Sequence, residues 1–144
     1  MRPNLKIKFS TADKVLEATS STALVLLWGF CFYSYFHSPE IVPIHYDGAG
    51  APDGYGDRIM IFLTGGIVTV MFTVITFVSR SPHKFNYLTE VTPENAQWQY
   101  ARAVRLLRWI KLGVVLLFLV IEYLSYRVNT VSYTHLTLPT ICSV

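Results

Sequence analysis

The sequence predicts an all-α integral membrane protein with three transmembrane helices and one structured extracytoplasmic loop. Two observations predict this fold. Only 15% of the 144 residues are charged and 52% are hydrophobic, whereas ordinary soluble domains carry about 25% charged residues. The apolar residues also occur in long runs, and about 20 apolar residues in a helix cross a hydrocarbon core ~30 Å thick. This composition argues against a soluble enzyme.

The first two runs each have the length and composition of a transmembrane helix. Residues 15–36 contain Glu17 as their only charge, and residues 59–78 contain none. A cleaved signal peptide is the competing interpretation of the first run. No small-x-small cleavage pattern follows it, and the apolar stretch is longer than a signal core. We therefore expect the first run to remain as a membrane anchor.

The third run, residues 106–127, is less uniform. Arg108 and Lys111 lie in its first turns and Glu122 lies near its end, so the uncharged stretch alone is too short to span. Trp109 and Tyr123 can lie at the two interfaces, and long basic side chains can reach back to the headgroups. We therefore predict that the whole segment forms a third transmembrane helix.

The distribution of Lys and Arg predicts the orientation. Four basic residues precede the first run, one lies in the loop of residues 37–58, and six lie between residues 79 and 111. The positive-inside rule then places the N-terminus and the second loop in the cytoplasm and the first loop outside. The net charge of +3 averages a basic inner face and an acidic outer loop, so the basic residues predict contact with anionic lipid and not with nucleic acid.

The outer loop, residues 37–58, has a composition typical of a defined shape. Its prolines fix φ and disfavour helix in the residue before them, and Pro52-Asp53-Gly54 has the residue types of a β-turn. Ile41, Ile44 and Tyr55 are expected to press back on the helix ends. The residues predicted to meet a ligand or partner are Pro43, His45, Asp47, Pro52, Asp53, Gly54, Tyr55 and Gly56.

The same loop carries a resemblance to a known family. Its prolines and glycines frame the pattern of Pro39, Pro43, Ile44, His45, Tyr46, Gly50, Pro52, Asp53, Gly54, Tyr55 and Gly56. This pattern resembles the signature of the bacterial membrane family called domain of unknown function 1648, which also forms the N-terminal part of SdpI-like immunity proteins. The similarity covers about residues 10–127. It implies an integral bacterial membrane protein without assigned catalytic residues.

The resemblance also bears on the C-terminal part of the chain. Short members of the family generally continue into a fourth hydrophobic helix, and the SdpI-like C-terminal region is also missing here. The chain instead ends in a polar segment interrupted by Thr, Ser and Pro, which is similar to a translated adapter sequence. We expect residues from about Val131 to be foreign and the natural protein to be truncated; a short native tail is the alternative.

Three roles remain open for the polar groups of the loop. His45, Asp47 and Asp53 are suitable ligands for a divalent cation, but their spacing matches no metal motif. Asp53 can instead accept backbone N–H groups of its own turn, and His45 can pack under the loop. Recognition of an extracellular ligand or partner is the third role.

Glu122 is the one acid far along an apolar run, and an acid within a membrane segment is a candidate for function. Water or an ion pair can satisfy it if it lies at the outer interface. The alternatives are a proton or cation pathway, or a polar contact with a missing helix or a partner.

A basic helix is expected ahead of the third span. Thr92 has the character of an N-cap and Pro93 that of the first helical residue, and the helix can continue unbroken into the third run. We predict that its basic side chains face lipid headgroups, with docking of a regulator as the alternative. These side chains are Arg102, Arg105, Arg108 and Lys111.

These predictions combine into a multi-pass protein of the bacterial inner membrane. We expect a non-enzymatic sensor, immunity protein or accessory subunit; the alternatives are a transporter component using Glu122 and an outer-face metal-dependent hydrolase. No cofactor is expected; beyond the bilayer, the candidate partners are a membrane or secreted protein and a second copy of the chain. The predicted segments are a tail at 1–14, helices at 15–36, 59–78 and 106–127, the loops 37–58 and 79–105, and a largely artefactual tail at 128–144.

Overall fold

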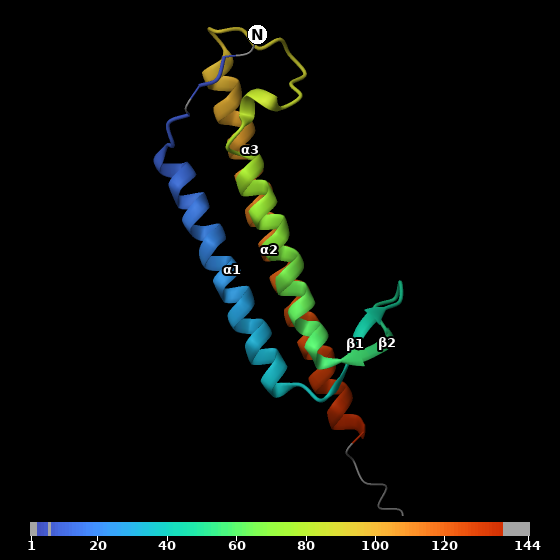
Figure 1. Cartoon of the computed structure of the whole chain (residues 1–144). Coiled ribbons are helices and arrows are strands. Elements are labelled where there is room, and N and C mark those ends of the chain that lie inside the picture. The colour runs from blue at the N-terminus through green and yellow to red at the C-terminus, as the bar shows by residue number, and fades with distance from the viewer. Residues whose placement is uncertain (1–2, 6, 137–144) are drawn as a thin grey trace, which may run out of the picture. The chain divides into compact units, whose positions relative to one another are not determined.

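The computed structural model describes residues 3–5 and 7–136. Helices dominate, and a small antiparallel sheet lies between the first two long helices in the chain (Figure 1). In order, the elements are α1 (Thr11–His37), β1 (Ile41–Tyr46), β2 (Pro52–Asp57), η1 (Arg58–Met60), α2 (Ile61–Val78), η2 (Pro82–Lys84) and α3 (Ala96–Leu136). The mostly helical prediction is confirmed, but the fold is not all-α.

The two strands were not predicted, and the predicted turn was misplaced. Pro52, Asp53 and Gly54 belong to β2, and the chain reverses direction between Tyr46 and Pro52 instead. Proline inside a run argues against a central strand, because it cannot donate to the ladder. Both strands of a two-stranded sheet are edges, so the proline residues of this hairpin are tolerated.

Helix α1 begins with a reciprocal cap. The Ser10 hydroxyl accepts from the Asp13 N–H at 3.2 Å, and the Asp13 carboxylate accepts from the Ser10 N–H at 2.9 Å. This capping box satisfies donors that the first turn leaves unpaired. A stripe of residues three or four apart is buried along the helix and just past its end: Asp13, Leu16, Ser20, Ala23, Leu27, Cys31, Ser34 and Ser38. Its small side chains suit close packing between helices.

Among the described residues, two helices are long and apolar enough to cross a membrane. They are Thr11–His37 and the segment Arg58–Val78, which joins η1 to α2. They match the two predicted spans of residues 15–36 and 59–78. The predicted third span, residues 106–127, lies within the 41 residues of α3, and its crossing stays a prediction.

Helix α3 differs from the prediction at its C-terminal end. It continues past residue 127 to Leu136, so the first part of the segment expected to be broken and foreign is helical. The rest of that predicted tail, including Cys142, lies outside the described residues. At the other end, the carbonyl of Thr92 accepts from the Asn95 and Ala96 N–H groups at 3.2 and 2.9 Å, and a hydrogen bond with Thr92 lowers the pKa of the Glu94 carboxyl. Thr92 therefore begins the turn that leads into α3, and the helix itself begins at Ala96 and not at the predicted Pro93.

The described residues form two compact units, and each long helix contributes to both. One comprises Met1–Leu26 and Ile67–Leu116. Within it, Tyr100 of α3 is fully buried and donates its hydroxyl to the Pro3 carbonyl at 3.1 Å, and its ring lies 5.6 Å from that of Tyr87. These contacts hold the N-terminal segment and the 79–95 connection against α3.

The second unit comprises Leu27–Gly66 and Leu117–Val144 within the described part of the chain, and it contains the hairpin. Aromatic rings fill the helix contacts. The ring centroid of Phe30 in α1 lies 5.7 Å from that of Tyr126 in α3. The ring centroid of Trp28 lies 6.2 Å from that of Phe62 in α2. A Cβ on Gly65 would lie 3.2 Å from the Trp28 ring, so the glycine permits this close approach.

Candidate functional site

The turn of the hairpin is organised by one carboxylate. Asp47 accepts from the N–H groups of Ala49 and Ala51 at 2.9 and 2.8 Å, and its own N–H donates to the Ala51 carbonyl at 2.9 Å. Gly50 has φ of 81°, a left-handed conformation that glycine adopts without steric cost. Asp47 was predicted as a recognition or metal residue, and it instead stabilises the turn of the hairpin. The sequence had assigned such a turn-stabilising role to Asp53.

A bulge in β1 brings two polar side chains together. Pro43 pairs with Tyr55 and His45 pairs with Gly54, so Ile44 between them has no partner across the sheet. A Cβ on Gly54 would lie only 2.9 Å from the Cβ of His45. The glycine is therefore required for His45 to lie directly over β2.

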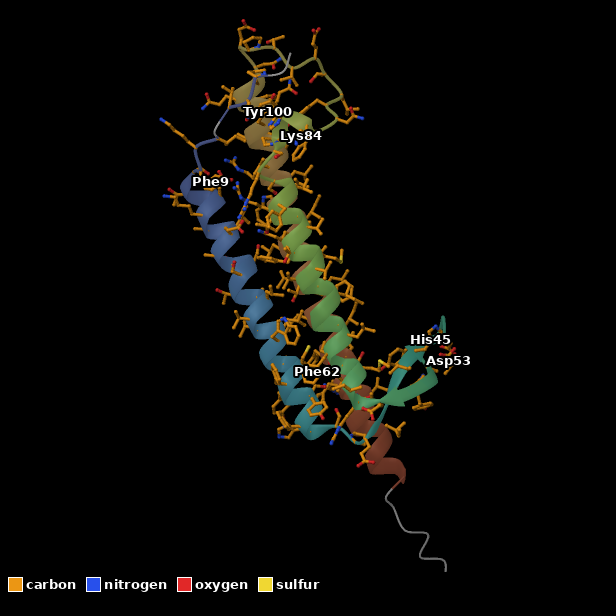
Figure 2. The ribbon with its side chains drawn as sticks, viewed as in Figure 1. Phe9, His45, Asp53, Phe62, Lys84 and Tyr100 are labelled. Carbon is orange, nitrogen blue, oxygen red and sulfur yellow. The ribbon has the colours of Figure 1, made fainter. Side chains whose placement is uncertain are left out.

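His45 and Asp53 form a pair on the exposed part of the hairpin. The His45 Nδ1 atom is hydrogen-bonded to Asp53 Oδ1, and the two side chains are 72% and 46% exposed. Figure 2 shows both side chains at the same end of the hairpin. The pairing fixes the orientation of the imidazole, so Nε2 is the ring nitrogen left to meet a ligand.

The base of the hairpin is tied to the helix ends. Asp57 accepts from the Ile59 N–H at 2.8 Å and so caps η1. The Arg58 N–H donates to the Glu40 carbonyl at 2.9 Å, and the Arg58 guanidinium lies 4.9 Å from the Tyr35 ring centroid. These contacts hold the hairpin at a defined place beside the entrance to α2.

The apolar side chains of the hairpin differ from the prediction. Ile41, Ile44 and Tyr55 are about half exposed or more and do not press back on the helix ends. Only Val42 is buried, at 2% exposure. The hairpin therefore presents apolar groups and the His45–Asp53 pair together on its accessible surface.

Comparison with known proteins bears directly on this hairpin. Residues 22–69 match the DUF1648 family. The family is described as a domain of unknown function, and the matched DUF1648 segment runs from the middle of α1 through the hairpin into α2. The predicted resemblance is thus confirmed here, whereas the SdpI-like relationship and the truncation remain predictions.

A more distant relationship extends to the archaea. An uncharacterized protein of Archaeoglobus fulgidus is 27% identical over 67 residues, which cover 46% of this chain. The aligned part spans only 37% of that relative's length. No solved structure matches the chain.

The hairpin of the DUF1648 segment uses its acids for hydrogen bonding within the protein. Asp47 holds the turn and Asp53 holds His45. Among the described residues, no three His, Cys, Asp or Glu side chains are grouped so that they could hold a metal ion. The arrangement is suited to recognition through one imidazole, one carboxylate and the neighbouring apolar groups.

Glu122 lies inside the second unit. It is only 4% exposed, and the hydroxyl-bearing side chains of Ser34 in α1 and Thr64 in α2 lie beside it. The carboxyl group is therefore enclosed by the protein, while its position relative to the membrane interface stays a prediction. The side chain lies where the three helices of this unit meet, and two of them belong to the DUF1648 segment.

The predicted lipid-facing basic residues differ in their surroundings, and Arg105 is partly exposed but bonded to Asp13. Arg102 lies 4.3 Å from the Trp98 ring, and that stacked pair can still meet headgroups. Arg108 and Lys111, however, have side chains only 6% and 2% exposed. For these two the prediction is wrong, because acids on α1 draw them inward.

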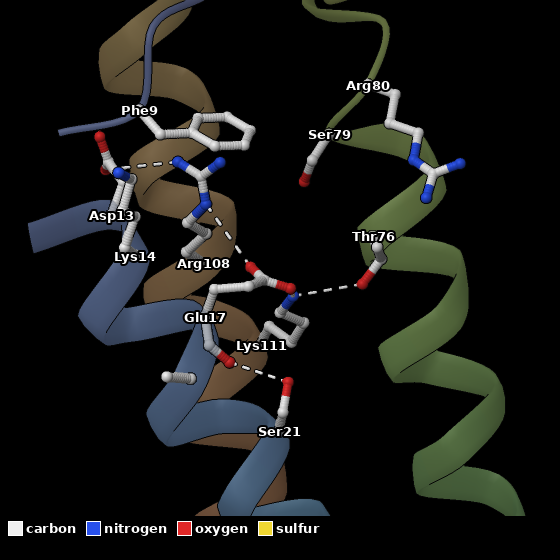
Figure 3. Close-up of a pocket in the computed structure, with 11 residues that line it drawn as sticks. Phe9, Asp13, Lys14, Glu17, Ser21, Thr76, Ser79, Arg80, Arg108 and Lys111 are labelled. Atoms are coloured by element: carbon white, nitrogen blue, oxygen red, sulfur yellow. Dashed lines mark hydrogen bonds and ion pairs between the residues drawn. The ribbon is translucent and has the colours of Figure 1, made fainter. Parts of the chain in front are cut away.

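The acids that pair with α3 lie one turn apart on α1. Asp13 lies 2.9 Å from Arg105 Nε and 3.3 Å from Arg108 Nη1. Glu17 lies 2.5 Å from Lys111 Nζ and 3.6 Å from Arg108 Nε. Lys111 also donates to Thr76 of α2 at 3.2 Å, as Figure 3 shows.

Sequence reasoning did not find this cluster, although a signal was present. The acids at positions 13 and 17 share one helix face, and so do the bases at 105, 108 and 111 near the start of the other helix. Opposite charges near the N-terminal ends of two parallel helical segments predict pairing when those segments pack together. The sequence-based prediction assigned the basic residues to lipid headgroups only, and therefore did not consider the acids of the first helix as their partners.

Proposed function

We propose that the chain is a non-enzymatic, multi-pass membrane protein of the immunity, sensor or accessory type, whose hairpin binds a secreted or membrane protein partner. One observation carries the proposal: the hairpin is held rigidly at its turn and base, yet it exposes Ile41, Ile44, Tyr55 and the His45–Asp53 pair. Exposed apolar groups beside oriented polar groups are typical of binding surfaces.

The sheet edges support a protein partner over a small ligand. A two-stranded sheet leaves N–H and C=O groups unpaired on both outer edges, and an extended segment of a partner can pair with them. Tyr55 supplies a large and rigid contact surface of the kind that dominates many interfaces.

We further propose that the hairpin lies outside the cell, with the N-terminus in the cytoplasm and α3 as a third span of a bacterial inner-membrane protein. The basic residues at 80, 84, 102 and 105 and the acidic residues of the loop support this orientation. It places the hairpin where a secreted partner can reach it.

A survival assay tests the proposed role. Cells that express the chain are exposed to medium containing toxins secreted by competing bacteria. We expect the native chain to raise survival and the double variant His45→Ala with Asp53→Ala to lose that protection. Glu90→Ala, at an exposed position outside the hairpin, controls for loss of one acidic side chain. Equal survival with the native chain and a correctly folded double variant would contradict the immunity role.

A further inference from the structure

A cavity in the first unit is lined by more positive than negative charge. Its volume is about 450 Å³, within the ~300–1,000 Å³ typical of small-molecule sites. All three long helices contribute to its wall. Figure 3 shows Lys14 on α1 and Arg80 just after α2 on two sides of the cavity, with the side chains of α3 between them.

The charges of the cavity wall do not cancel. Asp13 and Glu17 are already bound by the buried cations Arg108 and Lys111, and Arg105 adds a further bond to Asp13. Lys14 and Arg80 also line the cavity, and neither forms an ion pair with any residue that the structure describes. Two positive charges are therefore left over for a ligand.

The rest of the wall suits an anion with an apolar part, because Phe9 and Ala18 offer apolar surface. The hydroxyls of Ser21, Thr76 and Ser79 also line the cavity, but each donates its one hydrogen to the backbone carbonyl four residues earlier. Phe9 itself is held over the Arg108 guanidinium at 4.3 Å. The cationic groups are those expected around a phosphate.

The position of the cavity along the helices favours a headgroup. Lys14 directly precedes the apolar run 15–36, and Arg80 follows the apolar run 59–78 by two residues. Both cations thus lie where the apolar part of a helix ends, which is the depth of lipid phosphates for either orientation of the chain.

We propose that this cavity binds a phosphate-bearing anion through Lys14 and Arg80, with the ion pairs of Asp13 and Glu17 forming its rigid floor. The phosphate can belong to an anionic phospholipid or be free in solution. This inference does not depend on the proposed role of the hairpin, since the cavity and the hairpin belong to different units.

Two binding measurements on the detergent-solubilised full chain test the proposal and distinguish the sources. In the first, native mass spectrometry follows titration with phosphatidylglycerol and, separately, phosphatidylcholine. In the second, the midpoint of thermal unfolding is compared in sodium phosphate and in sodium chloride at equal ionic strength. Preferential binding of phosphatidylglycerol identifies a headgroup, and a higher midpoint in phosphate identifies the free ion.

The decisive variant is Lys14→Gln with Arg80→Gln. We expect roughly 30-fold weaker phosphatidylglycerol binding, or loss of the phosphate-dependent midpoint shift, because each of the two basic groups contributes about 1 kcal/mol near an anionic surface. The matched control is Lys8→Gln with Lys84→Gln, which removes the same charge from exposed positions outside the cavity wall.

A further variant separates loss of charge from misfolding of the double glutamine variant. Lys14→Arg with Arg80→Lys retains both charges and is expected to retain binding. The proposal is overturned if neither anion binds the native chain, if phosphatidylcholine binds as well as phosphatidylglycerol with no effect of phosphate, or if the double glutamine variant binds as tightly as the native chain.

Discussion

Individual side chains in this protein are constrained most strongly where two backbone segments approach each other closely. At Gly54, an added methyl group would meet the Cβ of His45, which is fixed to the backbone and cannot rotate away. At Gly48, in the turn of the same hairpin, an added Cβ would meet nothing within 4 Å. The two glycine residues therefore allow a matched comparison.

We predict that Gly54→Ala opens the bulged part of the hairpin at a cost of about 1–3 kcal/mol, the range for overpacking a tight contact. Limited proteolysis in detergent measures this as faster cleavage between residues 41 and 57. Gly48→Ala should be cleaved at the native rate. Equal resistance of the Gly54→Ala and native chains would show that the approach of His45 is looser than the structure has it.

A second prediction concerns the buried charges. Asp13→Asn keeps the shape of the side chain but leaves Arg108 with less compensation in a buried position. We expect a loss of roughly 3–5 kcal/mol of unfolding free energy, because removing one partner leaves the other charge buried. Unfolding by a denaturing detergent measures the loss.

The control for the buried charge is Glu40→Gln, which removes an acid from an exposed position. It should change the unfolding free energy by less than about 0.5 kcal/mol. If Asp13→Asn were as stable as Glu40→Gln, then Arg105 and Arg108 would not depend on Asp13 for their placement.

At the scale of elements, the helices could be predicted from the sequence and the strands could not. Runs 15–36 and 59–78 are apolar throughout, so length and composition suffice to identify them. The strands have only six residues each and contain Pro43 and Pro52. Proline argues against a central strand of a sheet, because it cannot donate a backbone hydrogen bond. The sequence did not reveal that the sheet has only these two strands, so that both of them are edge strands.

The polar groups of the site show the same division. The sequence indicated that His45, Asp47 and Asp53 belong to a shaped loop, and the structure places all three on the hairpin. It could not assign their roles, since the register that brings His45 to Asp53 depends on the bulge at Ile44. The inward position of Lys111 likewise depends on helix packing, which a single helix pattern does not reveal.

The turn of the hairpin provides a prediction for one element. Asp47→Ala removes the acceptor for the Ala49 and Ala51 N–H groups, and we expect a loss of about 0.5–2 kcal/mol from the turn, as for other lost capping bonds. Hydrogen exchange at those two amides should speed up.

Asp47→Asn is the matched variant for the turn, because its side-chain carbonyl can still accept both bonds. We expect slow exchange at residues 49 and 51 to be largely retained in it. Fast exchange in both variants would indicate that the charge and not the hydrogen bonding of Asp47 holds the turn.

The proposed function of the whole molecule depends on which side of the membrane each segment occupies. The acidic hairpin follows the first apolar run, and the basic connection of residues 79–95 follows the second. If both runs cross the bilayer, these segments lie on opposite sides. Recognition of a secreted partner then requires the hairpin to be outside.

Cysteine labelling in intact bacterial cells measures on which side of the membrane the hairpin lies. Single cysteines are introduced by Gly48→Cys in the turn and by Lys84→Cys in the connection, in a chain whose Cys31 and Cys142 are replaced by serine. A membrane-impermeant maleimide should label position 48 in intact cells and position 84 only after lysis. Labelling of position 84 in intact cells, with position 48 protected until lysis, would contradict the account.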